Sequence, residues 1–456
     1  MSDRATITHP GEPQSNAIRS RTAAIEPACL RTYTPSLAVL AKSAGSYHWT
    51  PEGRKLADFT SGVLVANLGH NPTRWWQRVG SYMGWSAPVQ GAKFTEAAPL
   101  TAYNAITELE TQASERLLAC LRSQPGGGRM EQVLWAASGS EAIQKALWAA
   151  LDRRPGSDVI LATRRGFHGK KGLAGAITGS ERDADRDPRV RFLSFPLEEC
   201  GSVERRRQPL DLAPYARELE ALWQEFGPRI CCLATEPYLG GGGSYHPQPE
   251  YLQLLDRFCK EHDIVFLLDE IQSNFGRTGN LFAYTTYGLE PDLVVLGKGL
   301  GNGVPVAAAV GRADLFAVMR YGEGSDTWSA NPLSCAAVLA TLDEFAAEDV
   351  LAHARELAAV IERGLLRLAE LPAVAAVRGE GLVWGLECVA VGGRTAEEVA
   401  VECVRRCYLG DERGRAIHLL GPLAGKVMRV SPPLVMPLEE AGDYLDAMYG
   451  LFAQII

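Results

Sequence analysis

The chain has 456 residues, which is enough for two or three folding units. Hydrophobic residues make up 46% of the chain and charged residues 22%, the composition of an ordinary globular protein. With 46 basic against 54 acidic residues and a formal net charge of −8, it is a poor candidate for binding nucleic acid or an anionic membrane surface.

The ten cysteines form no CxxC pair, and several lie in apolar surroundings, among them Cys231, Cys232 and Cys335. This pattern predicts buried thiols in a reducing compartment rather than disulfides or a zinc site, and we expect no metal ion. The first residues are polar and do not form a signal peptide, and no apolar run reaches membrane-spanning length. We therefore expect a cytoplasmic protein without a membrane partner.

The N-terminal part of the chain has little regular pattern. Residues 1–34 are mostly polar and are expected to form an arm that is flexible or lies on a partner. Residues 45–59 predict a hairpin with Pro51-Glu52-Gly53 at its turn. The following LGHNP stretch, residues 68–72, is typical of a turn, although such a loop also suits the edge of a site. We assign residues 35–75 to a segment that joins a small domain.

The middle of the chain alternates short apolar runs with amphipathic segments, which is typical of a mostly parallel sheet flanked by helices. We assign this large domain to residues 76–335. Its expected strands are residues 132–137, 158–163, 190–195, 229–235, 264–268, 293–296 and 304–310, and its expected helices are residues 107–121, 141–151, 215–226 and 250–262.

Helices and strands no longer alternate strictly in residues 336–456, which predicts a smaller α+β domain. The expected fold class is therefore α/β: a large domain on a mostly parallel central sheet, and a small domain formed by the C-terminal part with the N-terminal segment. The expected strands of the C-terminal part are residues 374–378, 382–389 and 426–430, and its expected helices lie within residues 331–347, 356–371, 395–408 and 438–452.

Two of the expected strands end in ionisable residues. Residues 264–268 run into Asp269 and Glu270, and residues 293–296 run into Gly297-Lys298. Open α/β sheets bind ligands at the carboxyl ends of their strands. A lysine forms a Schiff base with an aldehyde, and a carboxylate holds the proton of a basic ring nitrogen, so the pair suits pyridoxal 5′-phosphate (PLP). Taken alone, a loop cap explains Asp269 and a solvated turn explains Gly297-Lys298.

Two further stretches suit a phosphorylated ligand. Ser138-Gly139-Ser140 stands between an expected strand and an expected helix, so backbone N–H groups at a helix N-terminus form a natural phosphate cradle. An ordinary serine N-cap with Glu141 in the first turn explains the same pattern. The four glycines of residues 240–243 allow a backbone to approach a ligand closely, or simply make the loop flexible.

The order and spacing of these motifs resemble the class III (ω-type) aminotransferases, which are fold-type I PLP enzymes. The resemblance covers roughly residues 35–455 and rests on Asp269-Glu270-Ile271-Gln272, Phe275-Gly276-Arg277-Thr278-Gly279, Pro291-Asp292 and Gly297-Lys298. The chain departs from the family pattern at Asn274, where glycine is usual. This change is expected to stiffen the loop without removing the chemistry.

The resemblance implies roles for the residues around the PLP ring. Lys298 is expected to be the Schiff-base lysine and the general base, and Asp269 to keep the pyridine nitrogen protonated. Ile271 is expected to pack on one ring face, where plain core packing explains it equally well. Gln272 is expected to hydrogen-bond the ring hydroxyl.

Further positions match the family's cofactor contacts. Gly139 and Ser140 match its phosphate-binding turn. Phe167 matches the aromatic residue stacked on the second ring face, followed by His168 and Gly169, and Glu236 matches a glutamate near the cofactor. Thr327 matches a threonine that reaches the phosphate of the neighbouring subunit, which implies a homodimer with shared active sites, although Trp328-Ser329-Ala330 departs from the usual Phe-Gly-Gly.

Substrate contacts are matched at fewer positions. Arg429 matches an arginine that many members use for a substrate carboxylate, and a salt bridge in the small domain explains it equally well. Some members carry a glutamate that screens this arginine, and the equivalent residue here is Gly241. Decarboxylating relatives tend to have glutamine where this chain has Val63.

The resemblance implies PLP-dependent transamination. An amino group would move from an amino acid or ω-amino donor to an oxo acid or aldehyde, through a lysine aldimine and pyridoxamine phosphate. An aminomutase, racemase or decarboxylase on the same fold is the first alternative. A nucleotide-binding dehydrogenase lacks its GxGxxG motif here and leaves the Asp269 and Lys298 pair unexplained. A catalytically inactive binding protein is disfavoured by the intact Lys298, Asp269 and Gln272.

Overall fold

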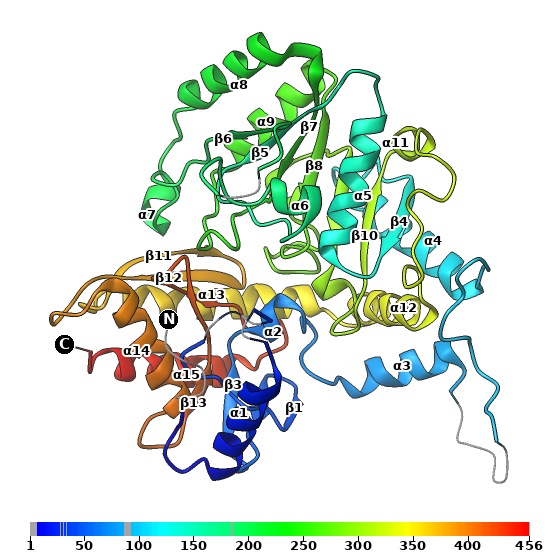
Figure 1. Cartoon of the computed structure of the whole chain (residues 1–456). Coiled ribbons are helices and arrows are strands. Elements are labelled where there is room, and N and C mark those ends of the chain that lie inside the picture. The colour runs from blue at the N-terminus through cyan, green and yellow to red at the C-terminus, as the bar shows by residue number, and fades with distance from the viewer. Residues whose placement is uncertain are drawn as a thin grey trace. The chain divides into compact units, whose positions relative to one another are not determined.

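The computed structural model describes residues 7–27, 29–30, 32, 34–85, 93–183 and 186–455 (Figure 1). The chain divides into two compact units: unit 1 comprises Met1–Pro72 and Ala352–Ile456, and unit 2 comprises Thr73–Leu351. In the described part of the chain, no helix is both long and apolar enough to cross a membrane.

Unit 2 is built on a seven-stranded sheet with the strand order β4-β10-β9-β8-β7-β5-β6. The pairings of β6 with β5, β5 with β7, β7 with β8 and β8 with β9 are parallel, whereas β10 is antiparallel to both β4 and β9. The predicted mostly parallel sheet is therefore confirmed. The strands are β4 (Gln132–Ala136), β5 (Val159–Thr163), β6 (Val190–Leu193), β7 (Ile230–Thr235), β8 (Val265–Asp269), β9 (Leu293–Leu296) and β10 (Ala307–Gly311).

The central strands of this sheet are apolar because helices cover the sheet. Every residue of β7, β8 and β9 is buried, and their sequences ICCLAT, VFLLD and LVVL are near-continuous hydrophobic runs of the kind that parallel sheets require. Helix α5 (Gly139–Asp152) packs against β9 and β10, and α9 (Pro249–Glu261) packs against β7 and β8. The predicted flanking helices are therefore confirmed.

Unit 2 has further helices, several of which the sequence did not predict. Helix α3 is one of these, although its apolar face buries Trp75, Val79 and Met83. The remaining elements of unit 2 are α3 (Thr73–Met83), α4 (Glu108–Arg122), α6 (Gly172–Ala176), α7 (Val203–Arg206), α8 (Ala213–Phe226), η2 (Gly227–Arg229), α10 (Ala283–Tyr287), η3 (Lys298–Leu300), α11 (Ala313–Ala317) and α12 (Pro332–Ala347).

Unit 1 contains two four-stranded sheets, with strand orders β1-β2-β3-β13 and β11-β12-β15-β14. This mixture of strands and helices confirms the predicted smaller α+β part. Its strands are β1 (Lys42–Ala44), β2 (Tyr47–Trp49), β3 (Lys55–Asp58), β11 (Val374–Glu380), β12 (Val383–Cys388), β13 (Ala416–His418), β14 (Leu420–Leu423) and β15 (Val427–Val430), and its helices are α1 (Pro13–Ile25), α2 (Ser61–Leu64), α13 (Val350–Leu368), α14 (Ala396–Leu409) and α15 (Leu438–Phe452).

The hairpin and the arm predicted near the N-terminus have different outcomes. Strands β2 and β3 form the expected antiparallel hairpin, and Gly53 adopts a positive φ of 82° in its turn. The arm, by contrast, contains helix α1. Arg19 of α1 is buried and donates hydrogen bonds to Glu12 Oε2 at 2.7 Å and Tyr408 Oη at 3.0 Å. The buried residues of α1 are the polar Ser15 and Arg19, which make hydrogen bonds to other polar residues. The helix therefore shows no periodic pattern of apolar residues in the sequence.

Candidate active site

The two strands that carry Asp269 and Lys298 are neighbours in the sheet. Asp269 is the last residue of β8 and lies opposite Val295 of β9 in a parallel pair. The N–H of Glu270 donates to Val295 O at 2.9 Å, so the pairing continues one residue beyond the strand. Lys298 follows β9 directly after Gly297. The predicted placement of an acid and a lysine at adjacent carboxyl ends of strands is therefore found.

The backbone at Lys298 is strained. Its φ is +48°, a conformation that residues with a side chain rarely adopt and that costs about 1–3 kcal/mol. Asn274 donates hydrogen bonds from Nδ2 to the carbonyl of Gly297 at 3.1 Å and to that of Ile271 at 3.0 Å. Asn274 stands where the family usually has glycine. Its side chain therefore links the chain after β8 to Gly297, the residue before Lys298. This contact agrees with the expected stiffening of the loop.

Asp269 is buried and oriented by two fixed donors. Its Oδ1 accepts the backbone N–H of Ile271 at 3.0 Å, and its Oδ2 lies 2.8 Å from Nδ1 of the buried His168. Burial opposes a charge on His168, but the hydrogen bond to Asp269 and the negative charges nearby outweigh it and hold the pKa of His168 above its usual value. His168 therefore fixes the orientation of the Asp269 carboxylate through this hydrogen bond.

Glu236 ties two loops together just beyond β7. Its Oε2 accepts the N–H of Phe167 at 2.9 Å, and its Oε1 accepts the N–H of Gly240 at 3.2 Å. The side chain is fully buried. Burial, with the charge of Asp269 adding to it, raises the pKa of Glu236 to about 7, although His168 opposes this shift.

The glycines after Glu236 are required by close packing. A Cβ atom at Gly240 would lie 2.1 Å from Oε1 of Gln272, and one at Gly241 would lie 2.8 Å from Cβ of Phe167. Neither distance is tolerable between unbonded atoms, so only glycine lets these two side chains approach the loop. The glycines of this loop therefore accommodate side chains of the chain itself, and close approach to a ligand stays a prediction.

The N-terminus of α5 meets the other predicted residues. Ser138 caps the helix, and Glu141 completes a capping box, so the ordinary cap is present. A Cβ at Gly139 would lie 2.7 Å from Cδ1 of Ile271, and one at Gly169 would lie 2.6 Å from Oγ of Ser140. Among the described residues, no hydrogen bond uses the N–H of Gly139 or Ser140. These two groups are thus available to an anion beside Ile271.

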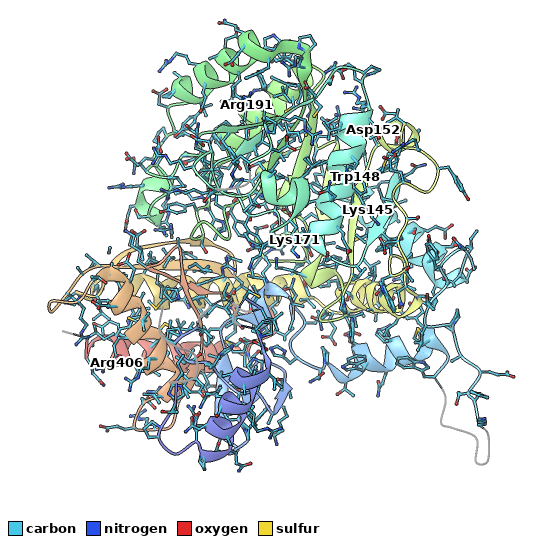
Figure 2. All side chains as sticks on the ribbon, in the orientation of Figure 1. Lys145, Trp148, Asp152, Lys171, Arg191 and Arg406 are labelled. Atoms are coloured by element: carbon cyan, nitrogen blue, oxygen red, sulfur yellow. The ribbon has the colours of Figure 1, made fainter. Side chains whose placement is uncertain are left out.

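Thr327 and Arg429 lie on other segments of the chain. Thr327 is exposed, and its neighbours Asp326 and Ser329 are bound by Lys145. Lys145 lies on α5 (Figure 2). The ammonium of Lys145, only 5% exposed, donates to Asp326 Oδ2 at 2.7 Å and to Ser329 Oγ at 3.1 Å. Arg429 is buried within β15 and belongs to unit 1.

Residues of unit 2 therefore fit a PLP molecule. Oε1 of Gln272 is buried, and no described residue donates a hydrogen bond to it. The ring hydroxyl of PLP could donate the hydrogen bond that Oε1 of Gln272 lacks. The buried carboxylate of Asp269 suits a protonated ring nitrogen, and the free N–H groups at the start of α5 suit a phosphate.

Three comparisons with known proteins agree with this assignment. The model of the family "Aminotransferase class-III" matches residues 29–452. The acetylornithine aminotransferase of Gloeobacter violaceus is 31% identical over 441 residues, covering 95% of this chain and 97% of the relative. The 2-aminoadipate transaminase of Pseudomonas putida is 30% identical over 424 residues, covering 89% and 94%. A PLP-bound amine transaminase from an uncultivated Pseudomonas species has a TM-score of 0.75 at 25% identity, covering 99% of each chain.

The fold and the site define a fold-type I PLP enzyme. By its family match, the chain belongs to the class-III aminotransferases. It catalyses PLP-dependent transamination, and its cofactor is pyridoxal 5′-phosphate. Nothing supports the mutase, racemase, decarboxylase, dehydrogenase or binding-protein alternatives.

Sequence reasoning missed two residues that hold this site together. Lys145 looks like one more charged residue of an amphipathic helix, because its partners Asp326 and Ser329 lie about 180 residues further along the chain. Asn274 was noticed only as a departure from the family pattern. Its three backbone partners could not be inferred, since Gly297 comes from a separate strand.

The raised pKa of Glu236 predicts a pH-dependent difference in stability. Between its ordinary value of 4.5 and about 7, folded protein without PLP binds a proton at Glu236 that unfolded protein does not, so stability falls as the pH rises through this window. Glu236→Gln is neutral throughout. We expect the variant to gain about 1–3 kcal/mol relative to the wild type between pH ~5 and pH ~8 in urea unfolding. A difference that stays constant with pH would contradict the assignment.

Proposed function

We propose that the residues gathered at the carboxyl ends of β8 and β9 carry the transamination. When bound, PLP supplies an electrophilic carbonyl and a ring that accepts electrons. Asp269 holds the proton on the ring nitrogen, and His168 and the N–H of Ile271 keep its carboxylate in place. The adjacent strand ends of Asp269 and Lys298 are the single observation that carries this proposal.

Lys298 is the proposed base. Its Nζ would hold the cofactor in the resting enzyme. Once freed, it would carry the proton from the amino-bearing carbon of the donor to the cofactor carbon that takes the amino group, and the second half-reaction would run this transfer in reverse. Gln272 accepts a hydrogen bond from the ring hydroxyl, Ile271 and Phe167 pack on the two ring faces, and the N–H groups of Gly139 and Ser140 bind the phosphate. Glu236 positions Phe167 through its backbone.

We propose that the donor is an amino acid or ω-amino acid whose carboxylate binds Arg429. The relatives are named for acetylornithine and 2-aminoadipate, and both compounds carry a carboxylate. A planar guanidinium binds a carboxylate through two parallel hydrogen bonds, which a lysine does not reproduce. Gly241 matches the position at which some family members carry a screening glutamate, and it has no side chain that could take that role.

We further propose that the protein is a cytoplasmic homodimer. All ten cysteines are free thiols, which suits a reducing compartment. Unit 2 exposes a set of large apolar side chains that a second copy would cover: Trp85, Phe94, Leu100, Tyr103 and Ile106. In this dimer the exposed Thr327 of one protomer reaches the phosphate bound by its partner.

The assignment of Arg429 predicts a selective kinetic defect. Arg429→Lys should raise KM by about 10–100-fold, with a smaller change in kcat, when the donor carries a carboxylate. N-acetylornithine and 2-aminoadipate are the donors to test first. An amine donor without a carboxylate should be unaffected. The matched control is Arg406→Lys, which alters an ion pair with Glu402 on α14. Equal losses with both kinds of donor would show that Arg429 has a structural role instead.

Shared active sites predict complementation between two inactive variants. Lys298→Ala removes the base in its own protomer, whereas Thr327→Asp places a negative charge against the phosphate held by its partner. Mixed dimers contain one intact site, so equal mixing with free subunit exchange should restore about a quarter of the wild-type activity. Ser325→Asp, on the same exposed loop, should be active alone. No recovery in dimers shown to be mixed would overturn the sharing of sites.

A further inference from the structure

Unit 1 contains a buried cluster of metal-ligating side chains that transamination does not use. His48, Asp58 and His70 each offer one ligand atom, and the three atoms all lie within 4.8 Å of one another. His48 is 2% exposed and Asp58 fully buried, while His70 is partly exposed at the edge. All three come from the N-terminal segment, whereas the PLP-site residues of β8 and β9 belong to unit 2.

The backbone holds these three residues in fixed positions. His48 lies on β2 and Asp58 ends β3, and the two strands are paired. His70 exchanges two backbone hydrogen bonds with Gly45, of 2.8 and 2.9 Å. The N–H of Asp58 donates to Ser46 O at 2.8 Å. Ligands carried on paired strands are held more precisely than ligands on a free loop.

The atoms of His48 and Asp58 that point away from the cluster already have hydrogen-bond partners. Nδ1 of His48 lies 2.7 Å from Oγ of Ser43, and when it donates its hydrogen there, Nε2 carries a lone pair. This Nε2 atom is buried, lies 3.5 Å from Asp58 Oδ2 and makes no hydrogen bond within the described residues. Oδ1 of Asp58 accepts two hydrogen bonds from Thr60, of 2.6 and 2.8 Å. Such outer partners are typical of metal-binding histidines and carboxylates.

The inner atoms converge on one point. Oδ2 of Asp58 lies 2.7 Å from Nε2 of His70, and the rings of His48 and His70 lie 4.4 Å apart between centroids. The ring of His418, on the strand paired with β3, stands edge-on to His48 at 5.5 Å and borders the cluster. Two imidazole nitrogens and one carboxylate oxygen are a donor set for a transition metal, not for magnesium or calcium.

We propose that His48, Asp58 and His70 bind one divalent transition-metal ion of the zinc class, with water as a further ligand. The metal replaces the proton on Nε2 of His70, which passes to Nδ1 or to solvent. Metal–ligand bonds of about 2.0–2.2 Å at tetrahedral angles place two ligand atoms about 3.4 Å apart. His70 Nε2 and Asp58 Oδ2, which lie 2.7 Å apart, must therefore separate by about 0.7 Å. The ion links β2, β3 and the chain up to residue 70, and so stabilises unit 1.

This site could not be predicted from the sequence, because its ligands have no motif spacing. His48, Asp58 and His70 are separated by intervals of 10 and 12 residues, and a turn explained the LGHNP stretch that contains His70. Only the pairing of β2 with β3 and the bridge between Gly45 and His70 bring the three side chains together.

The test compares metal content and metal spectra of the full-length holoenzyme. Wild type stripped of metal, reloaded with zinc and dialysed is expected to retain about one zinc per chain by mass spectrometry and to unfold at a higher temperature than the stripped protein. His48→Gln and His70→Gln should each lose this zinc and the thermal shift. The matched control is His353→Gln, which removes a partly buried histidine of unit 1 whose Nε2 lies 2.9 Å from the backbone carbonyl of Met436, and it should retain the zinc.

Cobalt loading separates this site from binding to the ten cysteines. Cobalt held by His48, Asp58 and His70 gives weak visible bands without the intense near-ultraviolet band of a thiolate ligand, and this measurement on wild type does not depend on whether a variant folds. Zinc retention that is equal in His48→Gln and wild type, a thiolate spectrum, or no retained metal would each overturn the proposal. In the last case the cluster is a hydrogen-bonded network alone.

Discussion

A buried carboxylate governs the organisation of the candidate active site. A charge taken out of water is costly unless it is hydrogen-bonded on each side, so Asp269 needs fixed donors. His168 and the N–H of Ile271 supply them, and each brings a loop with it. Glu236 then fastens the His168 loop to the glycine loop after β7. The site is therefore a set of loops held by two buried acids at the carboxyl ends of the adjacent strands β7 and β8.

The cost of this arrangement appears as backbone strain and restricted side chains. Lys298 has a left-handed backbone, and Gly139, Gly240 and Gly241 have neighbours that leave no room for a Cβ atom. Asn274 and Lys145 add side-chain hydrogen bonds to this framework, since one links the two strand ends and the other binds the loop of Thr327. Functional sites commonly store strain in this way.

The parts of this protein that follow local rules could be predicted from its sequence. Strands such as VFLLD and LVVL can be recognised in the sequence because both of their faces are buried, which requires a continuous apolar run. The charged residues that follow these runs mark the carboxyl edge of the sheet. Helix α1 could not be predicted, because its buried residues Ser15 and Arg19 are polar and show no apolar period. The cluster of His48, Asp58 and His70 and the bonds of Asn274 depend on pairing between segments distant in sequence, which local pattern does not encode.

The most direct test of the central claim is the visible absorption spectrum of the PLP-loaded protein, wild type beside Lys298→Ala. The account predicts a cofactor band in the wild type that changes when an amino donor is added. It predicts an altered band in Lys298→Ala, no response on the timescale of turnover, and wild-type behaviour in Lys171→Ala, which changes an exposed lysine (Figure 2). A Lys298→Ala protein with the wild-type band and undiminished turnover would contradict the claim that the strand ends of β8 and β9 form the catalytic centre.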